Sequence, residues 1–377
     1  MERSFVARIR ADLALKMVIL TGPRQVGKTT LAQALAAEAG RGQYLNWDVP
    51  GDRRILRDQA WNPRADLLVF DEIHKMPDWK AFLKGAWDGR GKGQAILVTG
   101  SARMETFRQA GASLAGRYYA LRLYPLSVRE CVDQLGGSAD DWLDRLMTRG
   151  GFPEPLLAEA DAEAERWRRQ YFSDIVREDV LEMGRIHELK AMRLLVEMLR
   201  ERVGSPLSIA SLARDLQLTP NTVARYLDIL EALFVVFTVR PFHRNVARAI
   251  LKEPKVYFFD TGFVSGDEGA RFENACAVML LKHVHFLCDT EGREVSLHYV
   301  RSKEGAEVDF AVCEKGEPVG FLECKLGDAR VSYFMKKLAA QFPRAGCVHA
   351  VCRLRQEEFR DGIAVVKAAG WLAALAA

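Results

Sequence analysis

Residues 17–30, with the sequence MVILTGPRQVGKTT, constrain the fold of this 377-residue chain more than any other stretch. An apolar run, a glycine-containing loop and a helix start follow one another, and Gly22, Gly27, Lys28 and Thr29 fit G-x-x-x-x-G-K-[ST]. In this pattern the backbone N–H groups of the loop surround phosphate oxygens, and the positive end of the helix dipole faces the same anion. The stretch therefore predicts an α/β fold whose first strand leads into a nucleotide-binding loop.

The residue types in the loop give each position an expected role. The Lys28 ammonium would contact the β- and γ-phosphates of ATP, and the Thr29 hydroxyl would be a ligand of Mg²⁺. The alternative is a glycine turn beside an unrelated lysine, but the strand and helix on either side favour the phosphate loop. The residues expected around the nucleotide are Gly22, Pro23, Arg24, Gln25, Val26, Gly27, Lys28, Thr29 and Thr30.

A second candidate strand, residues 66–72 (DLLVFDE), ends in two acids. Apolar runs of this length are typical of buried parallel strands, and ligands bind at the carboxyl ends of such strands. We expect Asp71 to bind the Mg²⁺ shell and Glu72 to polarise the attacking water. The alternative is an edge strand that ends in solvated acids.

Two further candidates flank the remaining strands of this sheet. Ser101 follows a buried strand at residues 95–99 and could hydrogen-bond the water or the γ-phosphate, or simply cap a helix. Arg117 precedes a strand at residues 118–123. It could act on a nucleotide in a neighbouring subunit, as an arginine finger does, or be an ordinary surface arginine.

Composition excludes several classes of protein. The net charge of +4, with both signs abundant, neither requires nor excludes a nucleic-acid partner. The seven cysteines are odd in number and lack a C-x-x-C pair, which favours a reducing cytosol over a disulfide framework or zinc site. No stretch approaches 18 uncharged apolar residues, so no membrane segment is expected. We expect a cytoplasmic protein.

The middle of the chain has helical patterning and then a winged-helix pattern. Residues 136–204 are expected to be helical, residues 208–233 to form a helix-turn-helix and residues 234–240 to form a wing strand. DNA is a candidate partner, but the second helix offers only Asn221 and Arg225, against Asp228 and Glu231. Base-reading helices usually carry more such groups, so a packing role stays open.

The carboxyl-terminal part predicts a small α/β domain with a possible metal site. If a hairpin centres on Gly316, Asp309 lies opposite Glu323, and Lys325 emerges on the same face. Carboxylates bind Mg²⁺ or Mn²⁺, and a lysine could orient a metal-bound water, with Glu273 on the preceding helix as a third acid. The alternatives are an inactive nuclease-like fold that binds a partner and a salt-bridged hairpin without a site.

These motifs together resemble known families. GPRQVGKTT, FDEIHK, TGSAR and the arginine before the last strand resemble AAA+ ATPases, more narrowly the AAA_14 type that is followed by a DUF4143 domain. The spacing from Asp309 to Glu323-x-Lys325 resembles PD-(D/E)xK nucleases, with Val308 where many have proline. The resemblance implies an ATPase core at 1–135, a helical linker at 136–204, a winged helix at 205–245 and a nuclease-like domain at 246–377.

Two functions follow from this interpretation. The first is an ATPase that acts on DNA and carries a metal-dependent nuclease. Its assembly stays open: Arg117 acting as a finger in a neighbouring subunit would require a homo-oligomer such as a ring. The second is a nucleotide-gated switch whose nuclease-like domain only binds a protein partner.

Overall fold

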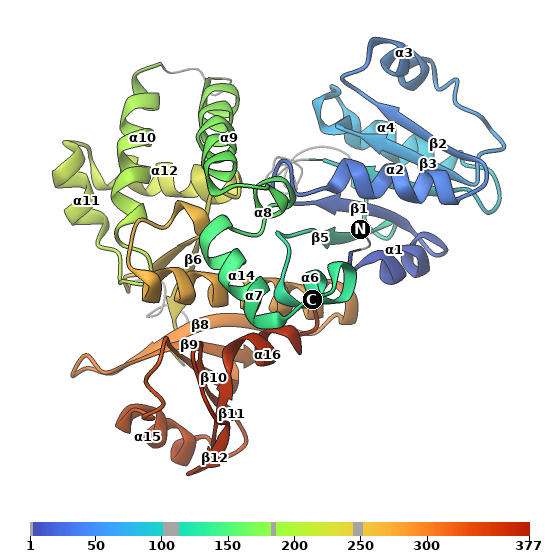
Figure 1. Cartoon of the computed structure of the whole chain (residues 1–377). Coiled ribbons are helices and arrows are strands. Elements are labelled where there is room, and N and C mark those ends of the chain that lie inside the picture. The colour runs from blue at the N-terminus through green and yellow to red at the C-terminus, as the bar shows by residue number, and fades with distance from the viewer. Residues whose placement is uncertain (1–2, 101–112, 182–185, 244–251) are drawn as a thin grey trace. The chain divides into compact units, whose positions relative to one another are not determined.

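A computed structural model describes residues 3–100, 113–181, 186–243 and 252–377. The chain divides into two units, residues 1–124 and 125–377 (Figure 1). Each unit is described by itself.

The first unit is a parallel sheet covered by helices. Its elements are α1 (Val6–Leu13), β1 (Met17–Thr21), α2 (Lys28–Glu38), β2 (Gly42–Asn46), α3 (Pro50–Asp58), β3 (Leu67–Asp71), η1 (Ile73–Lys75), α4 (Trp79–Asp88), β4 (Ala95–Thr99) and β5 (Tyr118–Arg122). All neighbouring strands are parallel, in the order β2-β3-β4-β1-β5. The predicted α/β fold is therefore confirmed, and the strands expected at residues 66–72, 95–99 and 118–123 are present as β3, β4 and β5.

The strand order determines which side chains meet at the nucleotide loop. Strands β1 and β3 are buried along their whole length, as their unbroken apolar sequences predict. Strand β4 lies between them, so the carboxyl ends of β1, β4 and β3 stand side by side. Helices α3 and α4 supply Leu56, Phe82 and Leu83 to a core cluster with Phe70 and Val98.

The second unit begins with a group of helices. These are α6 (Val128–Leu135), α7 (Ala139–Arg149), α8 (Pro153–Leu157), α9 (Asp161–Leu181), α10 (Ile186–Arg200), α11 (Ile209–Leu216) and α12 (Pro220–Ala232). Helix α12 starts where its sequence predicts, because Thr219 accepts a hydrogen bond from the Thr222 N–H and Pro220 occupies the first turn.

An antiparallel and parallel mixed sheet completes the second unit. Its elements are β6 (Val236–Pro241), β7 (Lys255–Phe258), η3 (Thr261–Phe263), α14 (Glu268–Glu291), β8 (Val295–Arg301), β9 (Glu307–Glu314), β10 (Glu317–Lys325), α15 (Tyr333–Gln341), β11 (Gly346–Val351), β12 (Glu358–Arg360), β13 (Ile363–Lys367) and α16 (Ala368–Ala373). The strand order is β12-β13-β11-β10-β9-β8-β6-β7.

The structure divides the chain differently from the expected boundaries. The first unit ends at Tyr124 rather than at 135, because α6 packs against α7 and α16 of the second unit. The expected boundary at 245 falls next to a single sheet, since β6, the strand expected to be a wing, pairs with β7 and also with β8. The helix-turn-helix and the carboxyl-terminal domain thus share a strand.

Candidate functional site

The loop between β1 and α2 requires glycine at its first position. Gly22 has φ 145°, and a Cβ there would lie 2.1 Å from the Leu123 carbonyl oxygen, so any side chain would collide with backbone. Gly27 also has a left-handed φ, 99°, directly before α2. Both glycines of the motif are therefore needed for the shape of the loop.

Lys28 lies buried at the start of α2. Its Nζ donates to the carbonyl oxygens of Gly22 at 2.9 Å and Pro23 at 2.6 Å. Burial lowers the pKa of Lys28 to about 8, with the charges of Glu72 and Asp71 acting in the opposite direction. The Lys28 ammonium is thus held by two neutral backbone carbonyls of the loop. A phosphate oxygen can replace these carbonyls as its hydrogen-bond acceptor.

Asp71 is the centre of a hydrogen-bond network at the carboxyl ends of three strands. Its Oδ2 accepts from the Thr29 hydroxyl at 2.8 Å and from the Tyr44 hydroxyl at 2.5 Å. Its Oδ1 accepts from the Glu72 N–H at 3.0 Å and from the Thr99 hydroxyl. A carboxylate beside a hydroxyl is an oxygen donor set that suits Mg²⁺, so Thr29 and Asp71 fit the ion that the motif implies.

Glu72 follows Asp71 in an unusual backbone conformation. Its φ is 54°, and its Oε2 lies 3.1 Å from the Lys75 Nζ. Non-glycine residues with a left-handed φ are uncommon and often mark functional sites. The Glu72 side chain is about a quarter exposed, which leaves it accessible to water.

Sequence reasoning missed three residues that support this site. Tyr44 and Thr99 each bind Asp71 from neighbouring strands, and burial together with Asp71 raises the pKa of Tyr44, so its hydroxyl donates. The Arg3 guanidinium donates to the Val26 carbonyl at 2.9 Å and to the Tyr124 carbonyl. The position of Thr99 at the end of an apolar run was an available signal, whereas nothing in the sequence singles out Tyr44 or Arg3.

The two remaining candidates of the first unit have different outcomes. Ser101 lies outside the described residues. Arg117 precedes β5, so it lies at the edge of the sheet opposite the phosphate loop, and it forms a bidentate pair with Asp88 at 2.9 and 3.1 Å. Arg117 is therefore unable to reach the nucleotide site of its own chain.

The carboxyl-terminal hairpin brings Asp309, Glu323 and Lys325 together in an unexpected way. The turn residues are Lys315 and Gly316, both with positive φ, so the turn does not centre on Gly316. A register shift between Pro318 and Gly320 adds one residue, and the ladder then reaches Leu322 opposite Phe310. Asp309 and Glu323 come next on the two strands, and Lys325 Nζ lies 3.5 Å from Glu323 Oε1.

Lys255 on β7 is a further member of this cluster that sequence reasoning missed. Its buried Nζ lies 3.1 Å from Glu273 Oε1 and also contacts Glu307. Burial alone would lower the pKa of Lys255, but Glu273, Asp309 and Glu307 raise it. The Tyr257 hydroxyl donates to the same Glu273 oxygen at 2.7 Å.

The other carboxylates of the cluster also have protein partners. Burial and the charge of Glu273 raise the pKa of Asp309 to about 7, although Lys325 and Lys255 oppose this. Glu323 Oε2 lies 3.4 Å from His349 Nδ1 and accepts from the Ser332 hydroxyl at 3.0 Å. Within the described part of the chain, no group of three or more His, Cys, Asp or Glu side chains is arranged to hold a metal ion. The metal roles of Glu273, Asp309 and Glu323 stay predictions.

The helix-turn-helix presents a sparse polar face. Asn221, Arg225 and Asp228 are exposed on α12 at helical spacing. Glu231 faces elsewhere, because its Oε1 accepts a hydrogen bond from the Thr238 N–H of β6 at 2.7 Å. Glu231, one of the two acids that weakened the case for DNA contact, therefore points toward β6 and not toward the exposed face of α12.

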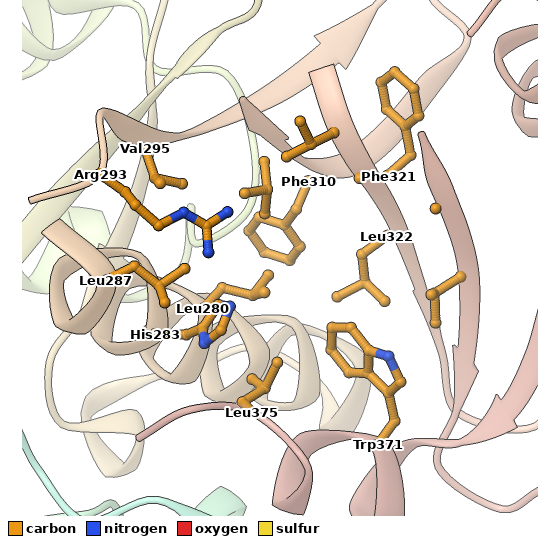
Figure 2. Close-up of a pocket in the computed structure, with 15 residues that line it drawn as sticks. Leu280, His283, Leu287, Arg293, Val295, Phe310, Phe321, Leu322, Trp371 and Leu375 are labelled. Atoms are coloured by element: carbon orange, nitrogen blue, oxygen red, sulfur yellow. The ribbon is translucent and has the colours of Figure 1, made fainter. Parts of the chain in front are cut away.

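An apolar cavity of about 260 Å³ lies between α14, the sheet and α16 (Figure 2). Its walls include Leu280, Phe310, Leu322 and Trp371. Its one arginine, Arg293, makes a bidentate pair with Glu314 at 2.9 and 3.0 Å. The cavity therefore offers little charge to a ligand.

Family comparisons agree with the architecture. Residues 15–132 match the AAA_14 family, described as an AAA domain; residues 140–267 and 268–370 match two domains of unknown function, DUF8612 and DUF4143. Among the described residues, no helix is both long and apolar enough to cross a membrane.

Similar proteins span most of the chain. An uncharacterized protein of Mycobacterium tuberculosis is 31% identical over 333 residues, covering 85% of this chain and 73% of that protein. One from Haemophilus influenzae is 23% identical over 341 residues, covering 81% of each chain. The Holliday junction branch migration complex subunit RuvB of Chlorobium phaeovibrioides is 40% identical over 79 residues, 19% of this chain and 21% of that protein.

Solved structures resemble the chain less closely. AMPPCP-bound DnaA from Aquifex aeolicus has 14% identity and a TM-score of 0.33, over 60% of this chain and 86% of that one. The similarity to the mycobacterial protein over 85% of this chain, with the matches to the AAA_14 and DUF4143 domains, defines the relationship. The chain belongs to the family of AAA-domain ATPases in which an AAA_14 core is followed by a DUF4143 domain.

Proposed function

We propose that this chain hydrolyses ATP at the loop site and uses the hydrolysis to act on DNA. The observation that carries the first part is the Asp71 network, which joins the Thr29 hydroxyl of the phosphate loop to the acidic end of β3. This pairing supports a proposed site in which Lys28 binds phosphate, Thr29 and Asp71 bind Mg²⁺ and Glu72 polarises water.

Each residue has a defined part in the proposed reaction. Lys28 leaves the Gly22 and Pro23 carbonyls and donates to the β- and γ-phosphate oxygens. Glu72 leaves Lys75 and orients water, whose oxygen bonds to the γ-phosphorus while the bond to the β–γ bridging oxygen breaks. Mg²⁺, held by Thr29 and Asp71, would supply charge neutralisation for the phosphates. Arg117 of a neighbouring copy would stabilise the transferred group, which requires an oligomer.

The test is ATP hydrolysis by purified variants. Lys28→Ala should abolish phosphate release, whereas Lys84→Ala, at an exposed lysine of α4, should leave it unchanged. Glu72→Gln should bind ATP but lose hydrolysis. Normal turnover in Lys28→Ala would refute the assignment.

If Arg117→Ala keeps full activity at every protein concentration, the proposed role of Arg117 in a neighbouring subunit fails.

Action on DNA rests on the exposed Asn221 and Arg225 of α12 and on the local similarity to RuvB, whose name places that protein at a DNA junction. Affinity for a labelled duplex should fall steeply with salt, because phosphate contacts release counterions. Arg225→Glu should weaken it, and Arg214→Glu on α11 serves as a charge-matched control. No binding at low salt would favour the nucleotide-gated switch.

Metal-dependent cleavage is a second candidate function, favoured by the convergence of Asp309, Glu323 and Lys325. DNA cutting with Mg²⁺ or Mn²⁺ that disappears in Lys325→Ala would support it. A metal ion would have to compete with Lys255 for the carboxylates. Absence of cutting on single- and double-stranded substrates would leave a binding domain.

A further inference from the structure

A second, polar cavity of about 440 Å³ lies between α9, α10 and η3. The two helices lie side by side in Figure 1, and both belong to the second unit. This volume is within the range of small-molecule pockets. The cavity is lined by Glu165, Arg168, Arg169, Phe172, Ser173, Arg193, Glu197, Arg200 and Phe263.

The wall carries an excess of positive charge. Four guanidinium groups face the cavity against two carboxylates, so two positive charges are unbalanced within the lining. Asp260, which pairs with Arg168 at 2.8 Å beneath the wall, offsets one of them. An anion in the cavity would therefore complete the local charge balance rather than disturb it.

The floor of the cavity is rigidly built. The buried Arg168 donates to Asp260 at 2.8 Å, to Glu165 at 2.7 Å and to the Arg149 carbonyl at 3.1 Å, and its guanidinium lies 5.9 Å from the centre of the Phe263 ring. Phe263 meets Phe172 edge to face at 5.7 Å. A planar ring would thus find an aromatic surface next to fixed positive charge.

The rim retains hydrogen-bond donors. Arg200 uses Nε on the Phe263 carbonyl and Nη1 on Glu197, at 2.7 and 2.8 Å, and its Nη2 has no partner among the described residues. Arg193 lies on the same face of α10, about two turns before Arg200. It is exposed and has no partner in the described part of the chain. Guanidinium groups with free N–H pairs bind phosphate oxygens in a bidentate manner.

We propose that this cavity binds a phosphorylated small molecule of nucleotide type, with its phosphate on Arg193 and Arg200 and its ring against Phe172. The site is separate from the phosphate loop and does not depend on ATP hydrolysis there. Its volume, between two helices and a 3₁₀ turn, suits a small ligand better than an extended strand.

The experiment uses the full chain carrying Lys28→Ala, which disables the phosphate loop, and measures binding of pyrophosphate and of AMP by calorimetry. We expect one site for each probe. Arg193→Ala should weaken binding about tenfold or more, because hydrogen bonds to charged groups are lost. Arg166→Ala is the matched control, since Arg166 is an exposed arginine of α9 outside the cavity.

Three results would overturn the proposal. One is no binding of either probe, and another is equal loss in the Arg193 and Arg166 variants. The third is tighter binding of a single-stranded oligonucleotide than of AMP with the same dependence on Arg193, which would assign the cavity to nucleic acid. Arg200→Gln provides a second variant, and its thermal unfolding must match the parent because Arg200 also contacts the Phe263 backbone.

Discussion

Lys28 and Lys255 are both buried ammonium groups, and the protein holds them in opposite ways. Lys28 donates to two backbone carbonyls, and burial lowers its pKa to about 8. Lys255 lies against Glu273 and Glu307, and these carboxylates with Asp309 raise its pKa despite burial. A buried lysine that donates only to neutral carbonyls can exchange those hydrogen bonds for bonds to an incoming anion. A lysine paired with carboxylates is instead held as their counterion.

The largest expected effect is a difference in the free energy of unfolding between variants of the two lysines. Lys255→Met should destabilise the second unit by about 3 kcal/mol, because it leaves the buried Asp309 and the partly buried Glu273 and Glu307 without their cation. Lys28→Met should change stability by at most about 1 kcal/mol, since carbonyls lose a donor but a desolvated charge is removed. Urea unfolding of both variants measures the difference. Equal losses would break the comparison.

The second effect concerns pH. The phosphates of ADP favour the charged form of Lys28, so the pKa of Lys28 should be higher in the ADP complex than in the free protein. Above pH 8, ADP binding should therefore take up a proton at Lys28. Affinity should be flat just below pH 8 and fall by up to about tenfold per pH unit above it. Calorimetry in magnesium-free buffers of different ionisation enthalpy would show the proton uptake. Release of protons at pH 9 would contradict the lowered pKa.

The third effect concerns metal binding at the carboxyl-terminal cluster. Lys255→Met removes a positive charge beside Glu273, Glu307 and Asp309, so Mn²⁺ should bind roughly tenfold more tightly than to the parent. Electron paramagnetic resonance of free Mn²⁺ measures this in the Asp71→Asn background, which removes the carboxylate ligand of the nucleotide site. Lys336→Met, at an exposed lysine of α15, is the control. Unchanged Mn²⁺ affinity would show that Lys255 does not compete with a metal.

The smallest effect tests the support of Asp71. Thr99→Val removes one hydrogen bond to Oδ1 at a cost of about 1 kcal/mol, which corresponds to about a fivefold loss of ATPase activity. Tyr44→Phe should have a similar effect through Oδ2. Tyr118→Phe at the far end of β5 should have none. If Thr99→Val lost more ATPase activity than Glu72→Gln, Thr99 would have more than a positioning role.

The sequence predicted those parts of the sites that depend on local chain geometry. The phosphate loop and Asp71 follow from a strand, a turn and a helix in succession. Tyr44 and Thr99 were missed because their contacts depend on the order β2-β3-β4-β1, which brings together strands distant in sequence. The alignment of Asp309 with Glu323 was expected from a turn centred on Gly316. The turn is instead centred between Lys315 and Gly316, and a register shift near Val319 restores the alignment.

Lys255 shows a different limit of sequence reasoning. It stands on β7, more than fifty residues before the acids of the hairpin, and no motif connects them. In the strand order β7 lies three strands from β9, so the contact of Lys255 with Glu307 arises from tertiary packing rather than from strand pairing. A pattern of acids thus predicted a cation site without indicating that a side chain supplies the cation.

The sharing of β6 has a mechanical consequence. Val236 to Val239 pair with β7, while Arg240 and Pro241 pair with β8, and Phe242 donates to the Tyr299 carbonyl at 2.7 Å. Turning the helix-turn-helix against the DUF4143 sheet would break this continuous ladder. Main-chain hydrogen bonds therefore couple the strand that follows α12 to the sheet of the Asp309–Glu323 hairpin, and separating the two would cost those bonds.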